Sequence, residues 1–201
     1  MAAPARRDVI ERAATELFAE RGYHRASMDE IARRSGVSVP VVYDHFASKE
    51  ELHRRLLERH FAELRSIWRE HLLGDDPPDQ RFYRTLDAWF AYVQTHPYAW
   101  RMLFRDTTGE PGIEAIRQDV AAESQALLLP LLAREPGLEK VAGADPESLD
   151  MVWHGLRSLI QGLALWWYDH QHVPRERVVA TAMNALWLGF ERVRAGETWQ
   201  P

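Results

Sequence analysis

His154 and Arg157, one helical turn apart, are the pair of residues best suited to bind a small molecule in this sequence. Their neighbours in the same predicted helix, Trp153, Leu156 and Leu159, are apolar. A buried guanidinium beside an imidazole can bind an anionic or carbonyl-bearing ligand. An ordinary buried ion pair or an exposed arginine accounts for the same spacing and is the more frequent case.

Metal and catalytic chemistry have few candidates. The chain has no cysteine, which removes disulfides and thiolates and leaves histidine and carboxylates as metal ligands. His24, His53 and His60 offer only an i, i+7 spacing on one helix, so we expect solvated or half-buried side chains rather than ligands. Residues 81–199 contain no glycine-rich phosphate loop, nucleophile elbow or HExxH motif. We therefore expect no enzymatic activity, no metal site and no cofactor.

The elements that carry these residues are predicted to be helices throughout. Apolar residues recur with a period near 3.6 along almost the whole chain, and no long stretch alternates with period two. Turn-forming residues separate the periodic segments, which indicates an all-α fold of about nine helices. The breaks fall at Gly22 and Gly36 and over residues 74–79, 107–112, 135–146 and 170–174.

Length and composition allow a small and a medium domain, since 46% of the 201 residues are hydrophobic. The predicted domains are residues 1–55 and 56–201, with one long helix running from the first into the second near residues 59–69. Net charge is −5, but 11 basic and 10 acidic residues lie up to His60. Binding to a polyanion must therefore be local and N-terminal.

The small domain begins with a helix whose apolar residues share one face and whose end is set by Gly22. Ser27 to Glu30 matches a capping box, in which the glutamate returns to the cap. Gly36 supplies a tight turn, a short helix follows from Ser38 to Phe46, and Ser48 to Glu51 forms a second capping box. The first helix is expected to bury Ile10, Ala13, Ala14, Leu17 and Phe18.

A helix, a tight glycine turn and a second short helix present that second helix to the major groove of DNA. A structural three-helix bundle with solvated polar residues is the alternative. The same segments resemble the DNA-binding domain of TetR-type transcription regulators over roughly residues 6–55. The resemblance implies an all-helical, homodimeric repressor whose C-terminal domain binds a small molecule and then releases DNA. It is carried by Ser27-Met28-Asp29-Glu30-Ile31-Ala32, Gly36-Val37-Ser38, Val42-Tyr43-Asp44-His45-Phe46 and Ser48-Lys49-Glu50.

The resemblance also assigns the DNA contacts. Ser27, Tyr43 and Lys49 would bind phosphates, together with the amides that start the helix after Ser27. Apolar side chains can pack on thymine methyl groups but lack the bidentate bonds worth ~1–3 kcal/mol, so DNA shape and nearby arginines must contribute. The recognition helix starts with Ser38, Val39, Pro40 and Val41, with Asp44 and His45 behind them, and the arginines are Arg6, Arg7, Arg25, Arg33 and Arg34.

Aromatic bulk marks the larger domain. A solid core accounts for any single aromatic residue more often than a ligand contact does. The resemblance implies a pocket for a small-molecule effector, and an aromatic lining favours a hydrophobic, ring-bearing one. Its lining is expected to come from Trp89, Phe90, Val93, Tyr98, Phe104, Trp153, His154 and Arg157.

The last two predicted helices, over residues 146–170 and 174–194, carry more apolar surface than one domain face requires. Small residues run along both and allow a second helix to approach closely, so two copies are expected to form a four-helix interface. Packing within the same domain is the alternative. The expected interface residues are Gly155, Ser158, Leu159, Gly162, Leu163, Trp166, Ala182, Leu186 and Gly189.

These features predict a cytoplasmic, homodimeric, ligand-responsive repressor that binds double-stranded DNA at a palindromic operator. No membrane association is expected, because no apolar run approaches the ~18 residues of a membrane helix and residues 1–7 do not begin a signal peptide. Two alternatives remain. One is the same regulator without small-molecule control, and the other is an all-α effector-binding or enzymatic protein in which the N-terminal bundle is a scaffold.

Overall fold

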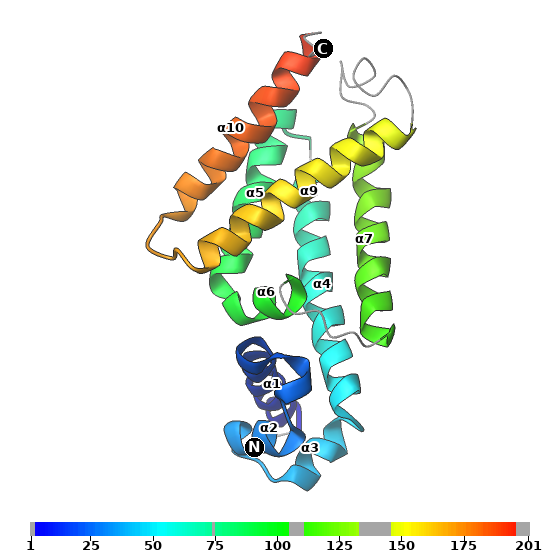
Figure 1. Cartoon of the computed structure of the whole chain (residues 1–201), viewed down its shortest axis with the longest axis vertical. Coiled ribbons are helices and arrows are strands. Elements are labelled where there is room, and N and C mark those ends of the chain that lie inside the picture. The colour runs from blue at the N-terminus through cyan, green and yellow to red at the C-terminus, as the bar shows by residue number, and fades with distance from the viewer. Residues whose placement is uncertain (1–2, 74, 105–110, 133–145, 196–201) are drawn as a thin grey trace. The chain divides into compact units, whose positions relative to one another are not determined.

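Helices form every regular element in the described part of the chain, residues 3–73, 75–104, 111–132 and 146–195 of a computed structural model (Figure 1). No strand occurs in these ranges, which confirms the all-α prediction. None of the helices described there is long and apolar enough to cross a membrane. In chain order these nine helices are α1 (Ala3–Arg25), α2 (Met28–Ser35), α3 (Val39–His45), α4 (Lys49–Leu72), α5 (Pro78–Thr95), α6 (Pro97–Phe104), α7 (Pro111–Leu132), α9 (Pro146–Tyr168) and α10 (Arg175–Arg194).

The chain divides into two compact units. The division falls inside α4, which runs without interruption over 24 residues and confirms the long helix expected near residues 59–69. It differs from the single boundary expected at residue 55, because α6 packs against α1 and belongs to the first unit. The first unit comprises Met1–Leu64 and Thr95–Asp119, and the second comprises Arg65–Gln94 and Val120–Pro201.

The apolar face of α1 forms the centre of the first unit. All five side chains expected on this face are buried, which confirms the pattern. Burying a leucine or phenylalanine side chain stabilises a fold by ~1.5–3 kcal/mol, so these contacts dominate the unit. The α1 residues are Ile10, Ala13, Ala14, Leu17 and Phe18, and fully buried side chains on α2 to α4 and at the end of α3 are Ile31, Val42, Phe46, Leu52, Leu56 and Leu57.

Two glycines with positive φ set the turns of this unit. Gly22, with φ 76° and ψ 163°, interrupts α1, but the chain resumes a short helical stretch instead of ending there as expected. Gly36 has φ 69° and ψ 24°, a left-handed conformation that favours glycine. Its N–H donates to the Arg33 carbonyl at 3.4 Å, and the Val37 N–H donates to the Ala32 carbonyl at 3.1 Å. These bonds close α2 and turn the chain towards α3.

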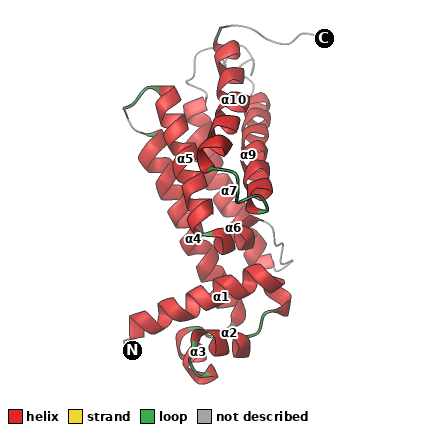
Figure 2. Ribbon diagram, turned by 90° about the vertical axis from the view of Figure 1, so that its left-hand side faces the viewer, coloured by secondary structure: helices red, strands yellow, loops and turns green. Residues whose placement is uncertain are grey.

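Aromatic side chains form the core of the second unit. The ring centres of Phe90 and Trp167 lie 5.9 Å apart, and those of Trp89 and Phe90 lie 5.1 Å apart. Trp167 Nε1 donates to the Val173 carbonyl at 2.8 Å and closes the turn between α9 and α10. These two helices pack against each other, as Figure 2 shows. The tryptophan thus joins α5 to the end of the α9–α10 pair.

Candidate nucleic-acid interface

The short helix α3 has the place and length expected of the segment from Ser38 to Phe46. Ser38 is its N-cap residue, and the Ser38 carbonyl accepts the Val42 N–H at 3.2 Å, although the serine hydroxyl makes no capping bond. At the other end the Phe46 N–H donates to the Val42 carbonyl at 2.9 Å. Val42 and Phe46 are four residues apart and fully buried, so they fix the rotation of α3 about its axis.

This burial leaves the other side of α3 open to solvent. Tyr43 is 50% exposed in spite of its large ring. The accessible surface is therefore apolar in the first turn, with a phenol hydroxyl and a carboxylate beyond it. The exposed residues are Pro40, Tyr43 and Asp44, and the half-buried ones are Val39, Val41 and His45.

Ser27 caps α2, since its Oγ accepts the Glu30 N–H at 3.3 Å. The second half of the expected capping box is absent, which corrects that prediction. The Glu30 carboxylate instead accepts from Arg21 at 2.8 Å and from Arg33 at 3.1 Å. Bonds between charged groups are stronger than a bond from a neutral amide, so the arginines hold the glutamate. Ser27 is exposed beside the first amides of α2, where a helix attracts anions.

Ser48 and Glu51 form the second capping box, at the start of α4. Ser48 Oγ accepts the Glu51 N–H at 3.0 Å, and the Glu51 carboxylate accepts the Ala47 N–H at 2.7 Å. The first half of the predicted box is confirmed, whereas the return bond goes to Ala47, one residue before the cap, and not to the Ser48 N–H.

Lys49, the first residue of α4, directs its ammonium group into the first unit. Nζ donates to the carbonyls of Tyr23 at 3.0 Å, Ala26 at 3.1 Å and His24 at 3.5 Å. It also lies 4.4 Å from the centre of the Tyr23 ring. The phosphate contact expected of Lys49 would have to compete with these bonds.

Most of the arginines expected to approach DNA are bonded to neighbours in the same unit. Arg34 lies 2.5 Å from Glu20, and this hydrogen bond lowers the pKa of the glutamate. Arg7 lies 3.3 Å from Glu11, and its guanidinium lies 5.2 Å from the centre of the Phe46 ring at the end of α3. Further bonds of this kind join Arg33 to Glu30 and Arg25 to the carbonyl of Arg21.

Comparison with known proteins agrees with this geometry. Residues 10–56 match the family described as "Bacterial regulatory proteins, tetR family". Over 190 residues the chain is 32% identical to the HTH-type transcriptional activator FasR of Mycolicibacterium smegmatis, an alignment that covers 94% of this chain and 84% of the relative. The chain belongs to the TetR family.

Solved structures of TetR-family proteins share the fold. A TetR-like transcriptional regulator from Rhodococcus sp. RHA1 matches with a TM-score of 0.73 and 21% identity, covering 96% of this chain and 97% of that one. A TetR-family regulator from Streptomyces coelicolor matches with a TM-score of 0.66 and 26% identity, covering 98% and 92%. The TetR family, and this chain with it, consists of DNA-binding transcription regulators rather than enzymes.

Two histidines in the first unit of this TetR-family protein are more buried than expected. His53 is 2% exposed and packs edge-on against Phe18, with ring centres 4.8 Å apart. Burial, reinforced by the charge of Arg117, lowers the pKa of His53 to about 3. His60 is 3% exposed, and burial beside Arg59 likewise lowers its pKa to about 3. Both rings are therefore neutral at pH 7. Within the described ranges no three metal-ligating side chains come together.

Half of the residues expected to line an effector pocket are buried in the second unit. Trp89, Phe90 and Val93 of α5 and Trp153 of α9 are each at most 4% exposed. Trp167, which was not predicted to line the pocket, packs directly on Phe90. Its spacing from Trp153, fourteen residues or almost four helical turns, was a signal that both share one face of α9.

The other four expected pocket residues are placed differently. Tyr98 and Phe104 belong to the first unit, where Tyr98 is 40% exposed. The His154 side chain is 61% exposed, and its Nδ1 lies 3.0 Å from the Asp150 carbonyl. The structure thus corrects the expectation of a buried histidine beside Arg157, which is half-buried. His154 adjoins Gly155, also exposed, and so falls on the solvent side of α9.

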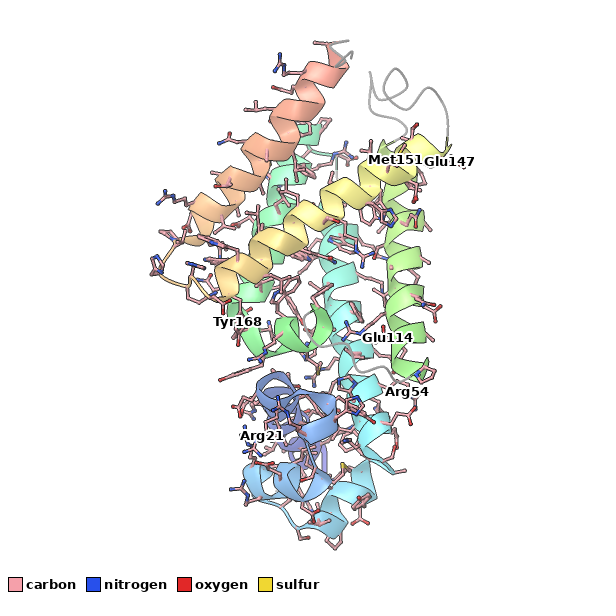
Figure 3. All side chains as sticks on the ribbon, viewed as in Figure 1. Arg21, Arg54, Glu114, Glu147, Met151 and Tyr168 are labelled. Carbon is pink, nitrogen blue, oxygen red and sulfur yellow. The ribbon has the colours of Figure 1, made fainter. Side chains whose placement is uncertain are left out.

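The solvent side of α9 and α10 in this TetR-family chain carries large apolar residues and glycines. Met151 is 67% exposed, and Figure 3 marks it between Glu147 and Tyr168 along α9. Trp166 is 48% exposed. A Cβ atom added at Gly155, Gly162 or Gly189 would meet nothing within 4 Å. Of the other expected interface residues Ser158 is exposed, Leu159, Leu163 and Leu186 are half-buried, and Ala182 is fully buried in its own chain, which corrects its assignment.

Proposed function

We propose that this regulator binds a palindromic operator as a homodimer, with α3 in the major groove, and that a small apolar effector controls its binding. The observation that carries the proposal is the placement of α3. Val42 and Phe46 anchor one side of the helix, while Pro40 and Tyr43 stand free on the other. The left-handed turn at Gly36 holds this helix against α2, the arrangement in which a recognition helix enters a groove.

The proposed DNA contacts divide by chemistry. Ser27, the first amides of α2 and the Tyr43 hydroxyl bind phosphates and set the register. Pro40, with the half-buried Val39 and Val41, meets base edges, where apolar side chains distinguish thymine by its methyl group. Ser38 and His45 lie at the two ends of the same helix and complete the set.

The proposed dimer forms through the solvent side of α9 and α10. A glycine makes a helix ~1 kcal/mol less stable than an alanine does. Nothing within the described part of this chain requires a glycine at the three helical positions with open space around them, so we infer that contact with another molecule does. Close approach of a second helix is such a contact, and the exposed Met151 and Trp166 supply the apolar area. Leu159 and Leu163, each half-buried, border the same surface.

The proposed effector site lies in the second unit, at the aromatic cluster of Trp89, Phe90 and Trp167, and Trp153 is buried in the same unit. Apolar and aromatic lining favours a hydrophobic ligand, and the half-buried Arg157 could bind a carboxylate or carbonyl at its edge. The family resemblance predicts repression, whereas the relative FasR is named as an activator. The sign of regulation is therefore an outcome of the test.

Footprinting on the DNA that flanks the gene tests the operator, and a reporter under the same promoter gives the sign. We expect protection of two inverted half-sites one helical turn apart, ~34–36 Å. Absence of any DNA binding at low salt would contradict the proposal.

Tryptophan fluorescence tests the effector. The chain contains eight tryptophans, whose emission reports on binding. From a panel of apolar aromatic acids of increasing size, we expect at least one to change this emission and to release the protein from its operator. A panel that leaves both signals unchanged would favour a regulator controlled by abundance or by a protein partner.

A further inference from the structure

Lys49 occupies a position where its charge is unfavourable unless something else compensates it. It is the first residue of α4, and the N-terminus of a helix carries partial positive charge. Its side chain leaves that end and reaches the last turn of α1, whose carbonyls carry partial negative charge and lack partners within the helix. The ammonium group at the start of α4 thus stabilises the C-terminal end of α1.

The ammonium group has its hydrogen-bonding capacity filled. It has three N–H donors, and three carbonyls accept at 3.0, 3.1 and 3.5 Å, from Tyr23, Ala26 and His24 in that order. The face of the Tyr23 ring, 4.4 Å away, adds a cation–π contact. A phosphate oxygen could bind Nζ only by displacing one of these acceptors.

The carbonyls that Lys49 contacts belong to residues 23–26, the last turn of α1 together with Ala26, which we call the α1–α2 connection. This connection follows the break at Gly22 and ends directly before Ser27, the cap of α2. The residue after Ala26 is Ser27, whose hydroxyl, together with the first amides of α2, is proposed to bind a phosphate. Lys49 therefore links the start of α4 to the residues that directly precede Ser27.

We propose that Lys49 is a positioning residue that holds the α1–α2 connection and thereby places Ser27, and that it is not itself a phosphate ligand. The inference rests on the proposed function, because it concerns how the first unit meets DNA. It replaces the contact that the family resemblance assigns to this lysine.

The test compares the full-length wild-type protein with Lys49→Gln in two measurements, thermal unfolding without DNA and operator affinity across a salt series. A lysine bound to phosphate contributes ~0.9 to the slope of log K against log salt. We expect Lys49→Gln to lower Tm by about 2–4 °C or more and to weaken operator binding roughly 5- to 30-fold with the slope unchanged. A slope reduced by ~0.9 overturns the proposal, whatever happens to Tm. An unchanged Tm overturns it as well.

Arg55→Gln is the matched control, because it removes one positive charge from an exposed position of the same helix. We expect its Tm to equal that of the wild type. An equal loss of Tm in both variants would assign the effect to charge alone and overturn the positioning role.

Lysine acylation of the wild-type protein provides a readout that needs no variant to fold. Lys49 and Lys140 are the two lysines of the chain, so the modified sites separate easily by peptide mapping. We expect Lys49 in the DNA-free protein to react at least tenfold more slowly than an N-acetyl-lysine amide added to the same reaction. Protection that develops only when operator DNA is added overturns the proposal. Since Tm and acylation require no DNA, failure of the wild type to bind DNA would count against the proposed function alone.

Discussion

Buried neutral histidines make the stability of the first unit depend on pH. His53 and His60 have pKa values lowered to about 3, while histidines of the unfolded chain titrate near 6.5. The folded state therefore disfavours the proton. The stabilisation is complete above pH 6.5 and is lost as pH falls from 6.5 towards 3.

Urea unfolding between pH 7 and 5 checks this dependence, because most carboxylates titrate below that window. We expect the free energy of unfolding to fall by up to ~1.4 kcal/mol per pH unit for each buried histidine. His53→Phe should remove one such contribution, and His172→Gln, at an exposed position, should leave the slope as in the wild type. A flat profile over this window would contradict the burial of both rings.

Tyr43 is the exposed residue of α3 whose role separates positioning from sequence recognition. If its hydroxyl binds a phosphate, Tyr43→Phe should weaken binding to operator and to unrelated DNA by a similar factor, roughly tenfold for ~1.4 kcal/mol. Fluorescence anisotropy with both DNAs measures this. Tyr83→Phe makes the same change at an exposed tyrosine of α5 and should have no effect. A loss confined to the operator would instead assign Tyr43 to base recognition.

At the scale of elements, local patterns were the reliable guide. The bounds of α3, the turn at Gly36 and the capping bond at Ser48 follow from neighbouring residues in the sequence and are all present. Features set by residues distant in the sequence were not predicted. Glu30 is held by Arg21, nine residues away, and Lys49 by carbonyls more than twenty residues away.

In the second unit, contacts between residues distant in the sequence determine still more of the structure. The position of α9 in the chain was predicted, but the side of the helix on which His154 lies was not, because it depends on which aromatic residues the other helices offer. Trp167 packing on Phe90 turns His154 to solvent. The glycines of the small-residue stripe have open space around them, whereas Ala182 is covered by its own chain, and the interface itself stays a prediction.

The turn before α3 permits a test in which only backbone conformation changes. A Cβ at Gly36 would meet nothing within 4 Å, so Gly36→Ala adds strain from the positive φ and no steric clash. We expect a loss of ~1–2 kcal/mol in unfolding free energy and weaker operator binding. Gly36→Asn is the control, because asparagine tolerates the left-handed region, and it should retain most of both quantities. Equal stability of the alanine variant would contradict the φ seen here.

At the scale of the whole molecule, DNA binding is expected to depend on the dimer. One short helix contacts few bases, whereas two copies read successive turns on one face of the duplex. The surface proposed for the partner is the solvent side of α9, which carries large apolar residues and helical glycines.

Gly162→Leu should block that approach without disturbing the chain, because its surroundings are open and leucine favours a helix. We expect a monomer by analytical ultracentrifugation, an unchanged circular dichroism spectrum and operator affinity reduced at least tenfold. Ala122→Leu adds the same side chain at an exposed position of α7 and should remain dimeric. If the Gly162→Leu variant is still dimeric, α9 does not form the dimer interface.

The pairing of arginines with glutamates also bears on how the regulator finds its operator among genomic sequences. Glu20 pairs with Arg34, and Glu30 is shared by Arg21 and Arg33, so two of these three positive charges are offset. The sequence up to His60 carries a net charge of only +1. Sequence-independent attraction to DNA scales with the phosphates that free cations can neutralise. We therefore expect weak retention on random DNA and little sliding along it. With weak non-specific binding, fewer copies of the regulator are held at non-operator sites in the genome. Operator occupancy is then expected to follow the abundance of the protein closely.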